Sequence, residues 1–158
     1  MPLAVDNDKV PSVGQTIVIH LNPSPGDDGC WHTFDDHSPG ASDLRGLING
    51  STPSPALSVG DQIRVKEGVA ASVLQEMSDQ LNLHGGTWDV VVPVIAAGSH
   101  TGWKEVLGFT AIRLTLVETT GGDKRIEATT LGDYVAPNTF PGGTTNYGLY
   151  SGSPRLLK

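Results

Sequence analysis

The chain has few of the residues that would cross-link it or anchor it in a membrane. Cys30 is the single cysteine among 158 residues, so an intrachain disulfide is excluded. No run of about 18 apolar residues occurs, which argues against a membrane-spanning helix within the sequence. A lone cysteine fits a reducing compartment or an exported bacterial protein that does not depend on disulfides. A chain of this length can bury a sustaining core, so we expect one domain over residues 1–158.

Basic residues are also scarce. The chain has 10 Lys and Arg against 17 Asp and Glu, giving a formal net charge of −7, and the basic residues form no stripe. Because phosphate binding needs clustered Lys and Arg, we do not expect nucleic acid as a partner. Glycine and proline are instead abundant, at 20 and 11 residues, and they lie mostly between apolar segments. This distribution of glycine and proline is typical of a β-rich domain with long loops.

The apolar pattern predicts mainly strands. Alternating apolar residues at 15–21 and 106–118 and a β-branched run at 88–95 are typical of strands. Pro93 predicts a bulge or an edge position, and a change of parity after Phe109 predicts a second bulge near Thr110 and Ala111. We expect a bent antiparallel sheet or a small barrel, with residues 133–158 as an irregular tail packed on it.

Two helices complete the predicted fold, which is β-rich α+β. Residues 69–83 have apolar positions at the spacing of an amphipathic helix, and two glycines follow them. Residues 43–49 predict a short helix, with Ser42 as its N-cap and Gly50 at its end.

One short polar cluster has the composition of a metal site. It consists of His32, Asp35, Asp36 and His37, and imidazole with carboxylate suits zinc or a similar ion. None of the established metal-ligand spacings supports it, so a solvated loop is the favoured interpretation.

Acidic pairs could bind calcium through their oxygens. Asp27 and Asp28 lie among glycines, and Asp6 and Asp8 form a similar pair. The EF-hand spacing is missing, so turn hydrogen bonds are the favoured interpretation and we expect no cofactor.

Catalytic motifs are weak throughout. Cys30 next to a base could act as a nucleophile, but beside Trp31 it reads as a packed side chain. His100 follows Ser99, yet the Gly-x-Ser-x-Gly elbow of serine hydrolases is not present. We therefore predict a protein that is not an enzyme.

Exposed tryptophans are the remaining candidates for binding. Trp31 and Trp103 could form a carbohydrate or partner surface, although core packing is the more frequent fate of tryptophan.

Six short segments, taken in order, resemble a known family. They are PLAV (2–5), PGDDGCWHTF (25–34), LRGLING (44–50), VGDQI (59–63), VVPV (91–94) and VLGFTAIRL (106–114). Together they resemble the extracytoplasmic part of TadG-like proteins, which belong to the Tad (tight-adherence) machinery that builds Flp-type pili in bacteria. The resemblance covers nearly all of the chain. It implies a soluble fragment of a longer membrane-anchored protein, with the anchor upstream, located in the periplasm or at the cell surface.

The leading functional hypothesis follows from this resemblance. It is a non-enzymatic envelope component of pilus assembly that contacts other pilus-assembly or envelope proteins, or itself. Two alternatives remain: a secreted binding module for carbohydrate or surface adhesion, and a metal-dependent hydrolase built on His32 to His37.

Overall fold

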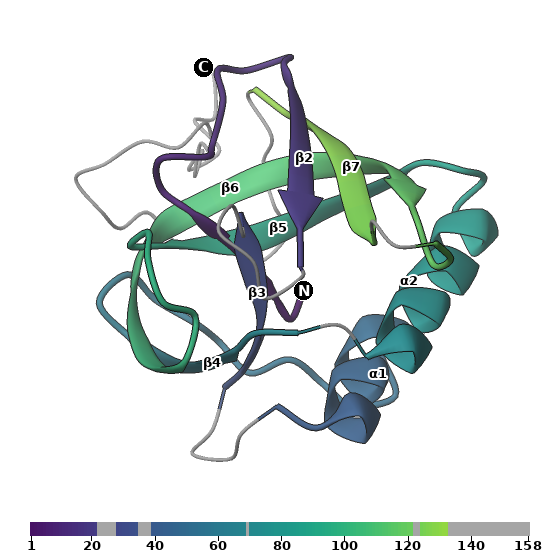
Figure 1. Cartoon of the computed structure of the whole chain (residues 1–158). Helices are drawn as coiled ribbons and strands as arrows, with labels where there is room; N and C mark the ends of the chain where they lie inside the picture. The colour runs from purple at the N-terminus through teal and green to yellow at the C-terminus, as the bar shows by residue number, and fades with distance from the viewer. Residues whose placement is uncertain (22–27, 35–38, 69, 122–123, 133–158) are drawn as a thin grey trace, which may run out of the picture.

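The computed structural model describes residues 1–21, 28–34, 39–68, 70–121 and 124–132 (Figure 1). The predicted tail at 133–158 lies outside these residues. Their helices and strands are β1 (Leu3–Asp6), β2 (Thr16–His20), β3 (Gly29–Thr33), α1 (Ala41–Asn49), β4 (Gln62–Lys66), α2 (Ala71–Leu83), β5 (Trp88–Ile95), β6 (Gly102–Val117) and β7 (Arg125–Thr130). The fold is mainly β, as predicted.

The seven strands form one sheet that closes partly on itself. The strand order is β2-β7-β6-β4-β3-β1-β5, and an additional pairing of β5 with β6 closes a ring of β6, β4, β3, β1 and β5. The pairing of β1 with β5 is parallel, through Val5 with Val94 and Asp6 with Ile95, and the other pairings are antiparallel. The sheet is therefore mixed rather than antiparallel throughout. The long connection between β1 and β5 permits the parallel direction, which no hairpin allows.

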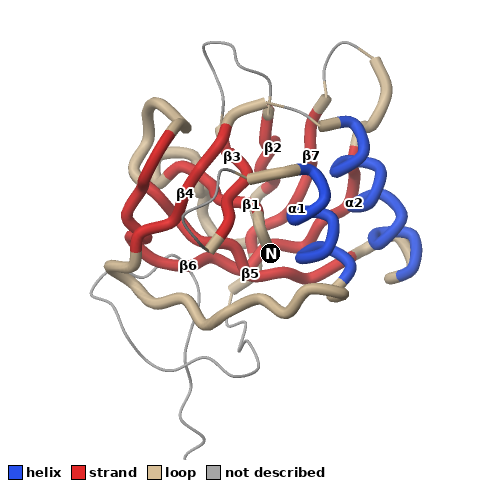
Figure 2. The backbone as a smooth tube through the Cα atoms, turned by 90° about the horizontal axis from the view of Figure 1, so that it is seen from below, coloured by secondary structure: helices blue, strands red, loops and turns tan. Residues whose placement is uncertain are grey.

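The core has two parts because the ring strands carry apolar side chains on both faces. The larger cluster includes Val90, Val92, Ile112 and Leu114 of the sheet together with the buried side chains of both helices. The smaller cluster comes from the ring strands alone, with Leu57 and Phe109 packed against it; its buried members are Ala4, Cys30, Ile63, Val65, Ile95 and Val106. Figure 2 shows both helices on one side of the sheet.

Helix α2 confirms the amphipathic pattern. Val73, Leu74, Met77 and Leu81 are buried on one face, and the chain leaves the helix at Gly85 and Gly86 with positive φ angles of 76° and 86°. Glycine adopts such angles easily because it has no Cβ atom to clash with the backbone. The helix begins at Ala71, two residues later than predicted.

Helix α1 begins earlier than predicted and is capped differently. Its N-cap is Gly40, so the prediction that Ser42 caps the helix is wrong; Ser42 lies in the first turn. Gly50 ends the helix at φ 76°, as predicted.

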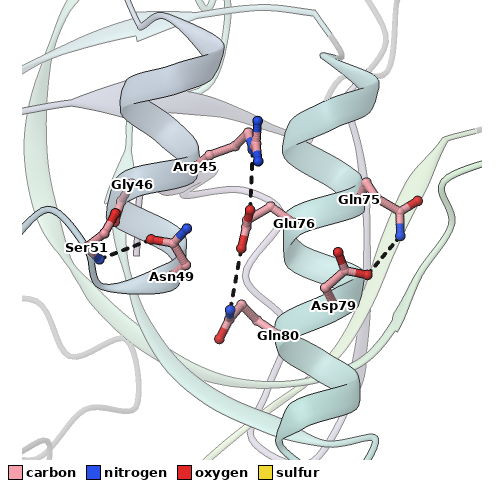
Figure 3. Close-up of polar contacts among 8 residues, drawn as sticks. All are labelled: Arg45, Gly46, Asn49, Ser51, Gln75, Glu76, Asp79 and Gln80. Atoms are coloured by element: carbon pink, nitrogen blue, oxygen red, sulfur yellow. Dashed lines mark hydrogen bonds and ion pairs between the residues drawn. The ribbon is translucent and has the colours of Figure 1, made fainter.

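The two helices pack side by side, and Arg45 Nε donates to Glu76 Oε2 at 3.3 Å across them (Figure 3). The turn after α1 is held by Ser51 N, which donates to Asn49 Oδ1 at 3.0 Å (Figure 3).

The bulges in the longest strand do not lie where the sequence predicted. Strands β5 and β6 pair without a shift from Trp88 opposite Leu114 to Val94 opposite Gly108, so a bulge at Thr110 and Ala111 is wrong. The register shifts between Val94 and Ile95, close to Pro93 as expected. The parity change was misleading because Phe109 packs on the second core cluster, on the face opposite Ile112.

Candidate functional site

An open polar and aromatic face lies on the β4–β6 ladder. Arg64 and Trp103 are direct cross-strand partners, and Arg64 Cζ lies 5.9 Å from the centroid of the Trp103 ring. This separation fits a cation–π contact, which orients the indole. Trp103 is 45% exposed. We name this surface the β4–β6 face; its residues are Gln62, Arg64, Lys66, Trp103 and Glu105, with Gln62 directly opposite Glu105.

The face arises from strand alternation. Ile63 and Val65 of β4 point into the second core cluster, so Gln62, Arg64 and Lys66 point outward. At the C-terminal end of β4, Lys66 lies opposite Trp31 and lines a pocket together with Leu44 of α1. Lys66 forms no ion pair with any described residue. The combination of Trp and Arg is the one enriched at the energetic centres of protein interfaces.

Trp31 has a different role. It is 2% exposed, and its Nε1 donates to the Gly68 carbonyl at 3.0 Å. The prediction that Trp31 belongs to an exposed binding surface is therefore wrong, because the indole packs in the larger core cluster. Trp31 also lines a pocket of about 320 Å³ together with Leu44, Lys66 and Ala70.

His32 of the predicted metal cluster is a core residue. It is fully buried, and its Nε2 donates to the Met1 carbonyl at 3.1 Å, so Nδ1 is the unprotonated nitrogen. Nδ1 has no hydrogen-bond partner among the described residues. Burial, with a smaller contribution from the nearby N-terminal charge, lowers the pKa of His32 to about 3. Asp35, Asp36 and His37 lie outside the described residues.

Asp28 is engaged by His20 and Lys9 of the protein itself. Its Oδ2 accepts from His20 Nδ1 at 2.8 Å, and its Oδ1 lies 3.2 Å from Lys9 Nζ. Asp27 lies outside the described residues. An ion bound by Asp28 would have to displace His20 and Lys9, so the carboxylate acts here as an ion-pair partner.

Asp6 and His100 form a buried pair. His100 Nε2 donates to Asp6 Oδ1 at 2.7 Å, and the two residues are 1% and 2% exposed. The backbone N of His100 donates to Glu67 Oε1 at 3.0 Å. These contacts, together with a bond from Ala97 N to Asn7 Oδ1 at 3.1 Å, fasten the β5–β6 connection over the end of β1. Asp8, the predicted companion of Asp6, is exposed.

Ser99 and Cys30 are the nucleophiles that the sequence suggested as candidates. Ser99 Oγ contacts Thr101 Oγ1 at 3.0 Å, whereas His100 Nε2 faces Asp6. Cys30 is 1% exposed within the second core cluster. Among the residues that the structure describes, no group of three His, Cys, Asp or Glu side chains is placed to hold a metal ion. Within the same residues, no helix is long and apolar enough to cross a bilayer.

Sequence reasoning found Trp103 but missed its partner Arg64. The available signal was the alternation of polar Gln62, Arg64 and Lys66 with apolar Ile63 and Val65, which already predicts one outward polar face. The pairing of that face with Trp103 depends on the β4–β6 register.

Comparison with protein-family models, with curated proteins and with solved structures found no match to this chain. Its candidate site therefore stands on the geometry of the β4–β6 face.

Proposed function

We propose that this chain is a non-enzymatic envelope component that acts through protein contacts in the assembly of Flp-type pili, outside the cytoplasmic membrane of a bacterium. The pilus system is suggested by the resemblance of its segments to TadG-like proteins. The single structural observation that supports a contact role is Trp103, a large aromatic side chain that is 45% exposed and backed by Arg64. Trp and Arg carry a disproportionate share of binding energy at protein interfaces.

Polar groups of the interior are engaged in contacts within the protein. His100 Nε2 lies 2.7 Å from Asp6 Oδ1, and His20 Nδ1 lies 2.8 Å from Asp28 Oδ2. The β4–β6 face is therefore the surface to test first.

Site-specific photo-crosslinking in cells tests this function. A photoreactive amino acid at position 103 is expected to give an adduct with a subunit of the pilus-assembly machinery, identified by mass spectrometry. The control is the same group at Thr115, which is also exposed on β6 but lies at the other end of the strand. Adducts with the same proteins from both positions, or no protein adduct at position 103, would contradict the proposal.

Carbohydrate binding is the second candidate, since an exposed indole beside Gln62, Arg64 and Glu105 also suits a sugar ring and its hydroxyl groups. Binding to a glycan array that Trp103→Ala abolishes would support this candidate. An array without any signal would remove it.

A further inference from the structure

The C-terminal end of α1 carries the pair Asn49–Gly50, and both residues are exposed. Asn49 is the last residue of the helix, and Gly50 follows it in the left-handed conformation, with φ 76° and ψ 6°. The ends of helices fray, so the backbone at this pair is freer to change conformation than the middle of α1. Gly50 also has no Cβ that would shield its amide nitrogen or hinder rotation of the backbone. This nitrogen is therefore an accessible group next to the Asn49 side chain.

The side-chain amide of Asn49 is held over the turn that follows the helix. Its Oδ1 accepts a hydrogen bond from Ser51 N at 3.0 Å, as Figure 3 shows. A donor on this oxygen draws electron density from Cγ and stabilises the negative charge that forms on Oδ1 when a nucleophile adds to Cγ. Nδ2, the amide nitrogen on the same carbon, has no hydrogen-bond partner among the described residues. The turn thus activates the amide carbon without holding its nitrogen.

We propose that Asn49–Gly50 is a site of spontaneous deamidation in the folded protein, with water as the only co-reactant. Gly50 N loses its proton to a base in the solvent and forms a bond to Asn49 Cγ. The Cγ–Nδ2 bond then breaks, Nδ2 takes up a proton and leaves as ammonia, and a five-membered succinimide ring remains. Water adds to one of the two carbonyl carbons of the ring and reopens it at the adjoining C–N bond. The product is an aspartate at position 49, or an isoaspartate when the bond to the main-chain carbon breaks.

The reaction changes the charge and the backbone at the end of α1. Either product makes the formal net charge of −7 one unit more negative. The new carboxylate lies at the negative, C-terminal end of the α1 macrodipole, which is the unfavourable end for an anion. Isoaspartate also adds one carbon to the main chain just before the turn at Gly50. Deamidation is therefore expected to loosen the end of α1, which packs against α2. The reaction needs no partner protein, so it is independent of the proposed contact function.

Two other exposed asparagines lack this combination and serve as internal references. Asn7 is followed by Asp8, and Asn82 is followed by Leu83 within α2. In both cases the next residue has a Cβ, which hinders the approach of its nitrogen to the amide carbon. Asn7 Oδ1 also accepts a hydrogen bond from a backbone N–H, at 3.1 Å. Asn7 therefore separates the effect of a donor on Oδ1 from the effect of a following glycine.

Incubation of the purified chain at neutral and at mildly alkaline pH tests this reaction. Samples taken over several weeks are digested with trypsin, which places Asn49 in peptide 46–64, Asn7 in peptide 1–9 and Asn82 in peptide 67–104. Mass spectrometry measures the replacement of the amide NH₂ by OH in each peptide. An isoaspartate-specific methyltransferase identifies the isoaspartate product. A digest of a sample that was not incubated corrects for reaction during handling.

We expect the Asn49 peptide to convert several-fold faster than the other two, and faster at the higher pH, because loss of the Gly50 N proton begins the reaction. Gly50→Ala is expected to slow the conversion several-fold, because it adds a Cβ beside the attacking nitrogen. Gly60→Ala is the matched control: Gly60 also has a positive φ, 92°, but no asparagine precedes it. This control should leave the rate at Asn49 unchanged. Unfolding curves measure the strain that each alanine introduces.

Three results would overturn the inference. They are equal conversion of the three asparagine peptides, equal rates in Gly50→Ala and the unaltered chain, and conversion that rises only with the unfolded fraction across a urea series. The last result would show that the folded end of α1 protects Asn49 rather than exposing it to reaction.

Discussion

The two ends of β6 differ in what lies against them. From Val106 to Val117 the strand pairs with β5 and β7, and α2 packs on it, so most of its side chains are buried or half-buried. From Gly102 to Glu105 it pairs with β4 and carries exposed Trp103 and Glu105. The same strand therefore contributes stability at one end and a contact surface at the other. Substitutions should separate the two roles.

The largest expected effect on stability comes from the buried tryptophan, Trp31. Trp31→Ala should lower the free energy of unfolding by about 3–5 kcal/mol, because it empties a buried site. Trp103→Ala, the same substitution on the open face, should change it by less than about 0.5 kcal/mol. Urea denaturation followed by circular dichroism measures both. Similar losses for the two variants would show that Trp103 is a packing residue.

A matched pair of leucines on α2 tests the same contrast between a buried and an exposed side chain. Leu74 is fully buried and Leu83 is 77% exposed. Leu74→Ala should cost about 2–5 kcal/mol, whereas Leu83→Ala on the same helix should cost a few tenths. The comparison is made by thermal or urea unfolding. A large loss for Leu83→Ala would mean that a further part of the chain covers the end of α2.

Acid should lower the free energy of unfolding through the buried His32. The pKa of this residue is about 3 in the folded protein and 6.5 in the reference state, so the unfolded chain binds the extra proton as the pH falls below 6.5. The contribution of His32 to stability is thus fully present above pH 6.5 and declines toward pH 3. The expected loss between pH 7 and pH 5 is about 2 kcal/mol.

Urea unfolding at pH 7 and pH 5 measures this change. His32→Leu should remove most of the difference between the two pH values, whatever its effect on stability at pH 7. If the variant retains the full difference, another group is responsible.

A smaller effect is expected at the buried pair that fastens the β5–β6 connection. Asp6→Asn keeps the size of the side chain and an acceptor for His100 but removes the charge. The expected loss is about 1 kcal/mol, the difference between a charged and a neutral hydrogen bond. Asp8→Asn, at an exposed neighbour, is the control. Hydrogen exchange at the amide of His100 should also become faster in Asp6→Asn; unchanged exchange would indicate that the other contacts hold the loop.

Local pattern was enough to predict much of the fold. Strand β2 and helix α2 follow from periodicity because each has one clearly buried face. Strand β5 follows from its run of β-branched residues. The bulge positions did not follow, because Phe109 and Ile112 are apolar on opposite faces of β6 and the sequence does not say that both faces have a core. The parallel β1–β5 pair was also beyond reach, since it joins segments that are far apart in the chain.

The candidate site was predictable only in part. Trp31 and Trp103 look alike in sequence, and the difference in their burial depends on which strand neighbours each one receives. Arg64 contacts the Trp103 ring only because the β4–β6 register places the two residues opposite each other.

The position of β2 sets a lower limit on how soon a growing chain can complete its sheet. Thr16 to His20 pair with β7, whose residues follow more than a hundred positions later. At a synthesis rate of about 5–20 residues per second, the first strand of this pair waits about 5–20 s for the second. During that interval Ile17 and Ile19 have no native partner strand, so the edge of β2 stays open to pairing with other chains until β7 has been synthesised.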